Sequence, residues 1–255
     1  MNGAFYIGAV GLDAQQRALD VVANNIANLN TTAFKRSAVQ FSDLVAPVRD
    51  GADQPMAAPD PIAGLTGAVA DTATRIWTMG PLRQTGQPLD VAINGDGFIE
   101  LLGPAGRSLL WRGGTLEVNS DGALATSDGT PLRAAISVPQ SATSLTIAQD
   151  GTVSAMVGGT SQKLGQIELA MVKSPDELVD DGNGYYETTD SSSVTSVQAG
   201  QDGSGLFVQG SLESSNVQLS DEMTSLLLIQ RAYAANAEVV QAGDQLMSIV
   251  NGLRH

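Results

Sequence analysis

The sequence contains no cysteine, and its single histidine, His255, is the last residue. Without cysteine the chain can form neither a disulfide framework nor a thiolate metal site. A histidine at a fraying chain end is a poor general base or metal ligand. A Ser-His-Asp triad would have no other histidine to use. We therefore expect no enzyme activity, no cofactor and no metal.

Long apolar runs and basic excess are missing as well. No segment approaches about 18 uninterrupted apolar residues, so we expect no insertion into a membrane. No Lys or Arg precedes Arg17, and the start of the chain therefore lacks the basic region of a cleaved secretory signal. The net charge of −14 leaves no basic footprint for a nucleic acid.

The charge that is present lies mostly in the middle of the chain. Residues 1–36 carry +1 and residues 214–255 carry −2, which leaves −13 for the residues between them. This distribution fits near-neutral helices that pack side by side beneath a soluble, mutually repelling exterior.

Apolar residues recur every seven positions near the N-terminus, which predicts a helix over residues 3–29. On its polar face, Asp13 and Arg17 have the i,i+4 spacing of an ion pair. The asparagines of NNIANLN compete with helical hydrogen bonds and should end the helix near Asn30. The predicted seam consists of Phe5, Leu12, Leu19 and Ile26, with Gly8, Gln15, Val22 and Leu29 beside it.

A second helix is predicted from about Ser220 to Leu253. Ser220 is the candidate N-cap, with Asp221 and Glu222 in the first turn and Arg254 near the end, as the helix dipole favours. Its seam consists of Leu219, Met223, Leu226, Tyr233, Ala237, Val240, Met247 and Val250.

The second helix also carries four consecutive apolar residues, Leu226, Leu227, Leu228 and Ile229. A helix that is apolar all round is buried on all sides. Two amphipathic helices ordinarily pack against each other within one domain, and that alternative stays open. One partner cannot cover the whole belt, however, so we expect further neighbours from other copies of the chain. The ends should then be weakly held in the monomer and order on assembly.

Between the helices, residues 37–80 are rich in Pro, Gly, Asp and Ala and read as an extended connector. From residue 81, short apolar runs are broken by Asn-Gly and Asp-Gly pairs, a strong hairpin signal. These pairs occur in INGDGFIEL, VNSDGALATSDG, IAQDGTVSA and DDGNGYYE. The predicted core consists of Val91, Ile93, Phe98, Leu101, Ile136, Val138, Leu145, Ile147, Val153, Ile167, Leu169 and Val172.

The predicted fold class is mixed α and β. The N- and C-terminal helices form a coiled-coil-like pair, and the middle domain is all-β and antiparallel. The predicted domains are a terminal helical assembly domain (1–36 and 214–255), an extended connector (37–80) and a β-rich middle domain (81–213).

Acidic clusters are the first candidates for chemistry. Adjacent acids, as in Asp176–Glu177, do not supply the spatial separation that glycosidase carboxylates need, so we interpret them as solvated turn residues. DDGNG at 180–184 lacks the alternating ligands and the closing Glu of a calcium loop.

Two further features are candidate binding sites. Gly-Asp-Gly at 95–97 is interpreted as a hairpin turn rather than a phosphate cradle, because no helix follows it. Trp77 and Trp111 can stack on a sugar, but such residues more often anchor a core or an interface.

Three blocks of the sequence resemble the bacterial flagellar rod, hook and basal-body protein family. They are GLDAQQRALDVVANNIANLNTTAFKRS, LDVAINGDGFIEL and the C-terminal stretch from GSLESSNVQLSDEM through LIQRAYAANAEVV. NTTAFKR and TSLTIAQDGTVSA are most similar to distal rod members. In the turn after the first helix, Ala33 stands where the family usually has glycine.

The resemblance implies a structural axial subunit of the flagellar basal body that polymerises helically into the rod and transmits torque from motor to hook. It implies export by the flagellar type III apparatus, a location crossing the periplasm, and contacts with other rod and hook subunits and with surrounding ring proteins. The residues assigned to self-assembly are Phe5, Leu12, Leu19, Val22, Asn24, Asn25, Ile26, Asn28, Leu219, Met223, Leu226, Leu227, Leu228, Ile229, Tyr233, Val240 and Met247.

Two alternatives stay open at this point. The asparagines 24, 25 and 28 either fix register as buried amides or simply end the helix. The chain is either a distal or a proximal rod subunit. A secreted β-domain enzyme or glycan-binding protein with a helical stalk leaves both terminal motifs unexplained.

Overall fold

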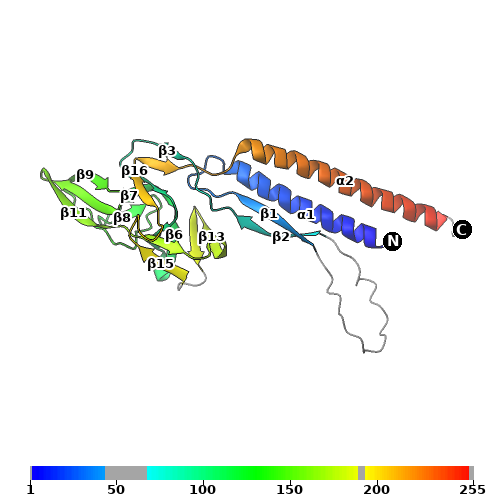
Figure 1. The fold of residues 1–255 in the computed structure, drawn as a ribbon, viewed down its shortest axis with the longest axis horizontal. Helices are drawn as coiled ribbons and strands as arrows, with labels where there is room; N and C mark the ends of the chain where they lie inside the picture. Colours follow the sequence, from blue (N-terminus) through cyan, green and yellow to red (C-terminus); the bar gives the residue numbers. More distant parts are fainter. Residues whose placement is uncertain (1, 44–67, 189–192, 253–255) are drawn as a thin grey trace, which may run out of the picture. The chain divides into compact units, whose positions relative to one another are not determined.

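A computed structural model describes residues 2–43, 68–188 and 193–252. The chain forms two compact units, each built from segments that are distant in sequence. Unit 1 comprises residues 1–27, 37–76 and 218–255, and unit 2 comprises residues 28–36 and 77–217. Figure 1 shows their elements, coloured along the chain.

Unit 1 contains the two long helices, α1 (Asn2–Ala27) and α2 (Leu219–Gly252). They lie side by side and run in opposite directions (Figure 1). Strands β1 (Ser37–Asp43) and β2 (Ala68–Arg75) pair antiparallel with a register shift between Val39 and Phe41, and α1 packs against both. The ends of the predicted connector are therefore strands in this unit, and residues 44–67 lie outside the described part.

The helix boundaries are close to those predicted, with one correction. The backbone amides of Asp221 and Glu222 both donate to Gln218 O, at 3.1 Å each, so α2 begins one residue earlier than expected. Ser220 therefore lies inside the first turn and is not the N-cap. The acidic first turn is confirmed, and Arg254 lies outside the described residues.

The described residues of unit 2 form antiparallel strands arranged in four sheets. A six-stranded sheet has the order β13-β14-β6-β5-β12-β15, and a four-stranded sheet has the order β16-β4-β7-β8. The smaller sheets are β11-β10-β9 and β17-β3. The first half of the unit contains β3 (Leu82–Gln84), β4 (Asp90–Asn94), β5 (Phe98–Leu102), η1 (Pro104–Gly106), β6 (Ser108–Trp111), β7 (Gly113–Val118), β8 (Leu124–Thr126) and β9 (Ala142–Ile147). The second half contains β10 (Thr152–Val157), β11 (Thr160–Gln166), β12 (Leu169–Val172), η2 (Pro175–Glu177), β13 (Leu178–Gly182), β14 (Tyr185–Thr188), β15 (Val194–Val197), β16 (Leu206–Gln209) and β17 (Ser211–Glu213).

Three of the four predicted turn motifs close hairpins. β7 pairs with β8, β9 with β10, and β13 with β14. The fourth prediction was wrong: the Gly-Asp-Gly turn at 95–97 joins β4 to β5, which belong to different sheets. A turn signal marks where the chain reverses, but it does not decide whether the flanking strands pair with each other.

The core of unit 2 confirms most of the predicted set. Nine of the twelve predicted residues are buried, and Val138, Leu145 and Val172 are partly buried. The prediction omitted several buried residues, some of which, such as Leu109 and Leu110, lie next to other apolar residues rather than in clear alternation. They include Ile99, Leu109, Leu110, Leu116, Leu124, Leu132 and Phe207.

Candidate assembly surface and the buried ion-pair network

The two helices of unit 1 have a defined antiparallel register. A Cβ on Gly8 would lie 2.6 Å from Val240 Cγ2, and one on Gly11 would lie 2.8 Å from Asn236 Nδ2. Near the other end of the pair, Asn25 Nδ2 donates to Glu222 Oε2 at 3.2 Å. Each increase in residue number along α1 is matched by a decrease along α2.

The face of α1 that is most buried carries small side chains. Ala14, Ala18, Val22 and Asn25 are buried, and they follow the i, i+4, i+8, i+11 spacing of one helix face. The predicted seam residues Leu12, Leu19 and Ile26 are half-buried. On the polar face, Arg17 Nε lies 3.0 Å from Asp13 Oδ2, which confirms that predicted ion pair. The side chain of Phe5 lies outside the described residues.

Asn25 joins three segments of unit 1. Its Nδ2 donates to Ser37 O at 2.8 Å, in addition to Glu222, and its Oδ1 accepts from Ser37 N at 2.9 Å. The side chain therefore replaces a backbone partner at the start of β1 while it also holds the start of α2. Asn25 is 1% exposed, so these bonds are shielded from water.

The other two asparagines have different surroundings. Asn24 is exposed on α1. Asn28 follows the helix end, where its Oδ1 accepts from Thr31 Oγ1 at 3.1 Å and its carbonyl accepts from Thr31 N at 3.1 Å. Within the monomer, Asn25 is a buried amide that fixes register, whereas Asn28 forms the turn after the helix.

Large apolar side chains remain exposed along α2. Leu227 is 58% exposed and Leu228 is 62% exposed, and Leu226 and Ile229 beside them are half-buried. Contiguous exposed apolar surface marks an interaction site. The other exposed apolar residues of α2 are Leu219, Met223, Tyr233, Val239 and Ile249; Val240 is half-buried, and the side chain of Met247 lies outside the described residues.

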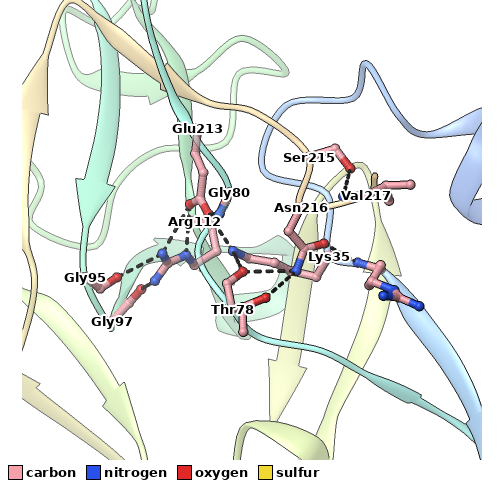
Figure 2. A network of polar contacts seen from close by, with 11 residues as sticks. Lys35, Thr78, Gly80, Gly95, Gly97, Arg112, Glu213, Ser215, Asn216 and Val217 are labelled. Atoms are coloured by element: carbon pink, nitrogen blue, oxygen red, sulfur yellow. Dashed lines mark hydrogen bonds and ion pairs between the residues drawn. The ribbon is translucent and has the colours of Figure 1, made fainter. Parts of the chain in front are cut away.

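In unit 2, three charged side chains form a buried network. Lys35 and Glu213 are each 1% exposed, and Lys35 Nζ donates to Glu213 Oε1. Arg112 Nη2 donates to Glu213 Oε2 at 3.2 Å. Figure 2 shows the Glu213 carboxylate between the two cations. A carboxylate that is ion-paired on both oxygens offsets the desolvation that an isolated buried charge would suffer.

Backbone groups complete this network. Lys35 Nζ also donates to Thr78 O at 2.9 Å, and Gly80 N donates to Glu213 Oε1 at 2.9 Å. Arg112 donates to the carbonyl oxygens of Gly97 at 2.6 Å and Gly95 at 3.0 Å (Figure 2). The guanidinium thus holds the 95–97 segment, which was interpreted from the sequence only as a hairpin turn.

Three ionisable groups have altered acidity for identifiable reasons. Burial lowers the pKa of Lys35 below 10.5, and this effect exceeds the opposite effect of Glu213. Burial raises the pKa of Tyr185, whose hydroxyl lies 2.9 Å from Asp128 Oδ2 and 3.0 Å from Thr126 Oγ1. Hydrogen bonds from Thr152 to the carboxylate lower the pKa of Asp150.

The weak sequence candidates for binding turn out to be structural. Trp111 is buried in the core, and Trp77 makes edge contacts with Phe98 and Tyr186 at centroid distances of 5.5 and 4.9 Å. In the 180–184 segment, Gly182 N donates to Asp180 Oδ1 at 2.9 Å within the β13–β14 hairpin.

The described part of the chain offers neither a metal cluster nor a membrane-spanning helix. In it, no group of three or more His, Asp or Glu side chains is placed to hold a metal ion. No helix among the described residues is long and apolar enough to cross a membrane.

Sequence reasoning missed the Lys35–Glu213–Arg112 network entirely. The three residues are separated by 77 or more positions, and each stands in an ordinary polar context. Charged residues make up only 16% of the chain. The one local signal was that Lys35, next to the predicted turn, has no acidic residue close to it in sequence with which it could pair.

Comparison with protein families gives three matches, in the order of the chain. Residues 5–35 match the family described as "Flagella basal body rod protein". Residues 92–155 match the "Flagellar hook protein FlgE/F/G D1 domain", and residues 208–253 match the "Flagellar basal body rod FlgEFG protein C-terminal". The first and last matches cover α1 and α2, and the middle match lies in unit 2.

Individual relatives align over almost the whole chain. The flagellar basal-body rod protein FlgG of Agrobacterium fabrum is 37% identical over 97% of this chain and 98% of its own length. FlgG of Caulobacter vibrioides is 34% identical over 98% and 99%, respectively. FlgF of the same organism is 32% identical over 94% and 93%.

These matches extend from the first helix through the β domain to the last helix, so they describe the whole chain rather than one module. The chain belongs to the family of flagellar basal-body rod proteins FlgG, the non-enzymatic structural proteins of the distal rod, and its place is the flagellar basal body, where it assembles with other rod and hook subunits.

Proposed function

We propose that this subunit polymerises helically with copies of itself through its terminal helices, and that the exposed apolar residues of α2 form the contacts. The observation that carries the proposal is the exposure of Leu227 and Leu228, in a helix whose partner α1 already occupies another face. A surface of this kind is favourable only when another apolar surface covers it. The covering surface is a neighbouring subunit.

A tube requires heterologous contacts that do not close into a ring. In this arrangement α1 and α2 form a coiled-coil-like pair in the inner wall of the tube. The assembly role falls on residues 1–36 and 214–255, with residues 37–80 contacting adjacent subunits and stiffening the shaft. The shaft then transmits torque from the motor to the hook, inside the surrounding ring proteins.

Delivery of the subunit is part of the same proposal. We infer that the chain travels unfolded through the flagellar type III export apparatus to the end of the growing rod and crosses the periplasm in its assembled form. On this route α1 and α2, which come from opposite ends of the chain, would pair only after the whole chain has emerged.

The experiment compares Leu228→Asp with Leu228→Met in the bacterium that carries this chain. The aspartate places a charge where the proposal has a dry contact, whereas methionine conserves apolar volume. Because Leu228 is exposed in the monomer, both variants should fold. Leu228→Asp should abolish rod assembly and motility, and Leu228→Met should retain both. Normal motility of Leu228→Asp would overturn the proposal.

A further inference from the structure

The chain passes between the two units four times, at residues 27/28, 36/37, 76/77 and 217/218. Any force that one unit exerts on the other along the chain must pass through these covalent links. On the unit 2 side, the links continue into residues 28–36, 77–80 and 213–217. The way these three segments are held therefore decides where the force enters the β domain.

The three segments are bonded to one another. Ala33 N donates to Glu213 O at 2.8 Å, which ties the first segment to the third. Lys35 Nζ donates to Thr78 O and to Glu213 Oε1, which ties the first to the other two. Gly80 N donates to Glu213 Oε1, which ties the second to the third.

Asn216 makes a second set of ties beside the ion pairs (Figure 2). Its Oδ1 accepts from Arg36 N at 2.7 Å, and its Nδ2 donates to Thr78 O at 3.0 Å. Its own backbone N donates to Phe34 O at 3.3 Å. Each of the three segments thus has a bond to each of the others within one or two residues of a crossing between the units.

The network is also attached to the sheets of unit 2. Glu213 is the last residue of β17, and Arg112, which pairs with it, lies between β6 and β7. Through Arg112 the network reaches the 95–97 turn between β4 and β5. A pull on residue 36 is therefore shared among the six-stranded, four-stranded and two-stranded sheets rather than borne by a single strand.

We propose that the network of Lys35, Arg112, Glu213 and Asn216 is a mechanical clasp, through which load between unit 1 and unit 2 enters the β domain without peeling out residues 28–36. The inference rests on the proposed function, in which the subunit transmits torque. Directional bonds resist displacement of one segment along another, and the burial of Lys35, Arg112 and Glu213 keeps water from replacing the bonds among them. Forced unfolding is governed by an unfolding rate, so a clasp is expected to act on that rate more than on equilibrium stability.

The charge balance of the clasp supplies a variant that weakens it without leaving a buried charge unpaired. Lys35→Met removes both bonds of the ammonium group, whereas Glu213 keeps its pair with Arg112 and its bond from Gly80. The remaining buried pair has one positive and one negative charge. Because apolar replacement of a buried charge is often tolerated when no charge is orphaned, the variant should stay folded.

The test is a pulling experiment on single molecules of the full-length monomer at constant force. The chain has no cysteine, so pairs of introduced cysteines define where the handles attach. Handles at the exposed positions Asn30 and Thr160 load the clasp, and handles at Ser120 and Thr160 load only the sheets of unit 2. The matched control is Arg133→Met, which breaks an ion pair with Glu100 (3.1 Å) far in sequence from any crossing.

With the first pair of handles, Lys35→Met should shorten the folded lifetime about tenfold, the factor expected when one or two net hydrogen bonds leave the barrier. An early step that releases residues 30–36 should accompany the loss. With the second pair, the same variant should retain a lifetime close to that of the unmodified chain. Any change in folded lifetime caused by Arg133→Met should be the same with both pairs of handles.

Equal shortening with both pairs of handles would overturn the clasp, because Lys35 would then be an ordinary contributor to stability. No shortening with either pair would overturn it as well. If Lys35→Met does not fold, Asn216→Ala removes the side-chain bonds of Asn216 to Arg36 N and Thr78 O and gives the same comparison. The measurement uses monomers, so its failure is distinct from a failure of Leu228→Asp to block assembly.

Discussion

Gly8 of α1 faces Val240 of α2 so closely that a Cβ on the glycine would lie 2.6 Å from Val240 Cγ2. No real Cβ contact is that short, and a β-branched valine has little freedom to move away in a helix. The close approach of the two helices therefore depends on the absence of a side chain at residue 8.

This contact predicts an inverted response to a common stabilising substitution. Gly→Ala inside a helix usually gains about 1 kcal/mol, but Gly8→Ala should instead lower the free energy of unfolding of unit 1 by about 1–3 kcal/mol through overpacking. Gly11→Ala is the matched control, because it meets the rotatable amide of Asn236. Hydrogen exchange of α1 amides measures the loss of stability in both variants. Faster exchange in Gly11→Ala than in Gly8→Ala would contradict the register of the helix pair.

The three bonds of Asn25 predict a difference between neighbouring asparagines. Asn25→Ala leaves Ser37 N and Ser37 O without their partner and should reduce stability by about 1–3 kcal/mol. Asn24→Ala, on the exposed face, should cause a clearly smaller loss, because an exposed side chain leaves no backbone group buried without a partner and alanine is the better helix former. Urea unfolding monitored by helical ellipticity compares them, and equal losses would rule out a special role for Asn25.

Ala33 has a backbone φ of 57°, in the left-handed region that favours glycine. A non-glycine residue there is disfavoured by about 1–2 kcal/mol, part of which glycine returns through its unfolded-state entropy. Ala33→Gly should therefore raise the free energy of unfolding of unit 2 by about 0.5–1 kcal/mol. Ala134→Gly, at a residue without positive φ, should lower it. A lower free energy of unfolding in Ala33→Gly would mean that burial of the Ala33 methyl group contributes more to stability than its backbone strain costs.

The lowered pKa of Lys35 predicts a sign for pH dependence. The folded chain releases the Lys35 proton at a pH below 10.5, whereas the unfolded chain keeps it up to that value. Between the two pKa values the unfolded state binds more protons, so stability rises with pH in this window. The free energy of unfolding of the unmodified chain, minus that of Lys35→Met, should increase as pH rises toward 10.5. A decrease would show that Glu213 holds the proton on Lys35 more strongly than burial removes it.

Local patterns in the sequence predicted the parts of the fold that depend on local physics. The seven-residue spacing identified both helices, and the Asp-Gly pairs identified three hairpins, because backbone preference and turn geometry are set by neighbouring residues. The exposure of Leu228 also followed from the sequence, since a belt of four apolar residues cannot all face one partner.

Contacts between distant residues were not predictable in the same way. Lys35 and Glu213 are 178 positions apart, and no periodicity connects them. The Gly-Asp-Gly turn at 95–97 was identified, but its attachment to Arg112 depends on how two sheets meet. The family resemblance supplied the function, whereas the residues that hold unit 2 at its crossings became visible only in three dimensions.

The central claim is that neighbouring subunits cover the exposed face of α2 in the rod. A single Leu228→Cys substitution gives the chain its only thiol, and a thiol-specific reagent measures its accessibility in monomers and in isolated basal bodies. The labelling rate should fall about tenfold or more on assembly, because reaction would then require local opening. Thr160→Cys in unit 2 should react similarly in both states. Equal labelling of the Leu228→Cys thiol in the monomer and in the rod would contradict the account.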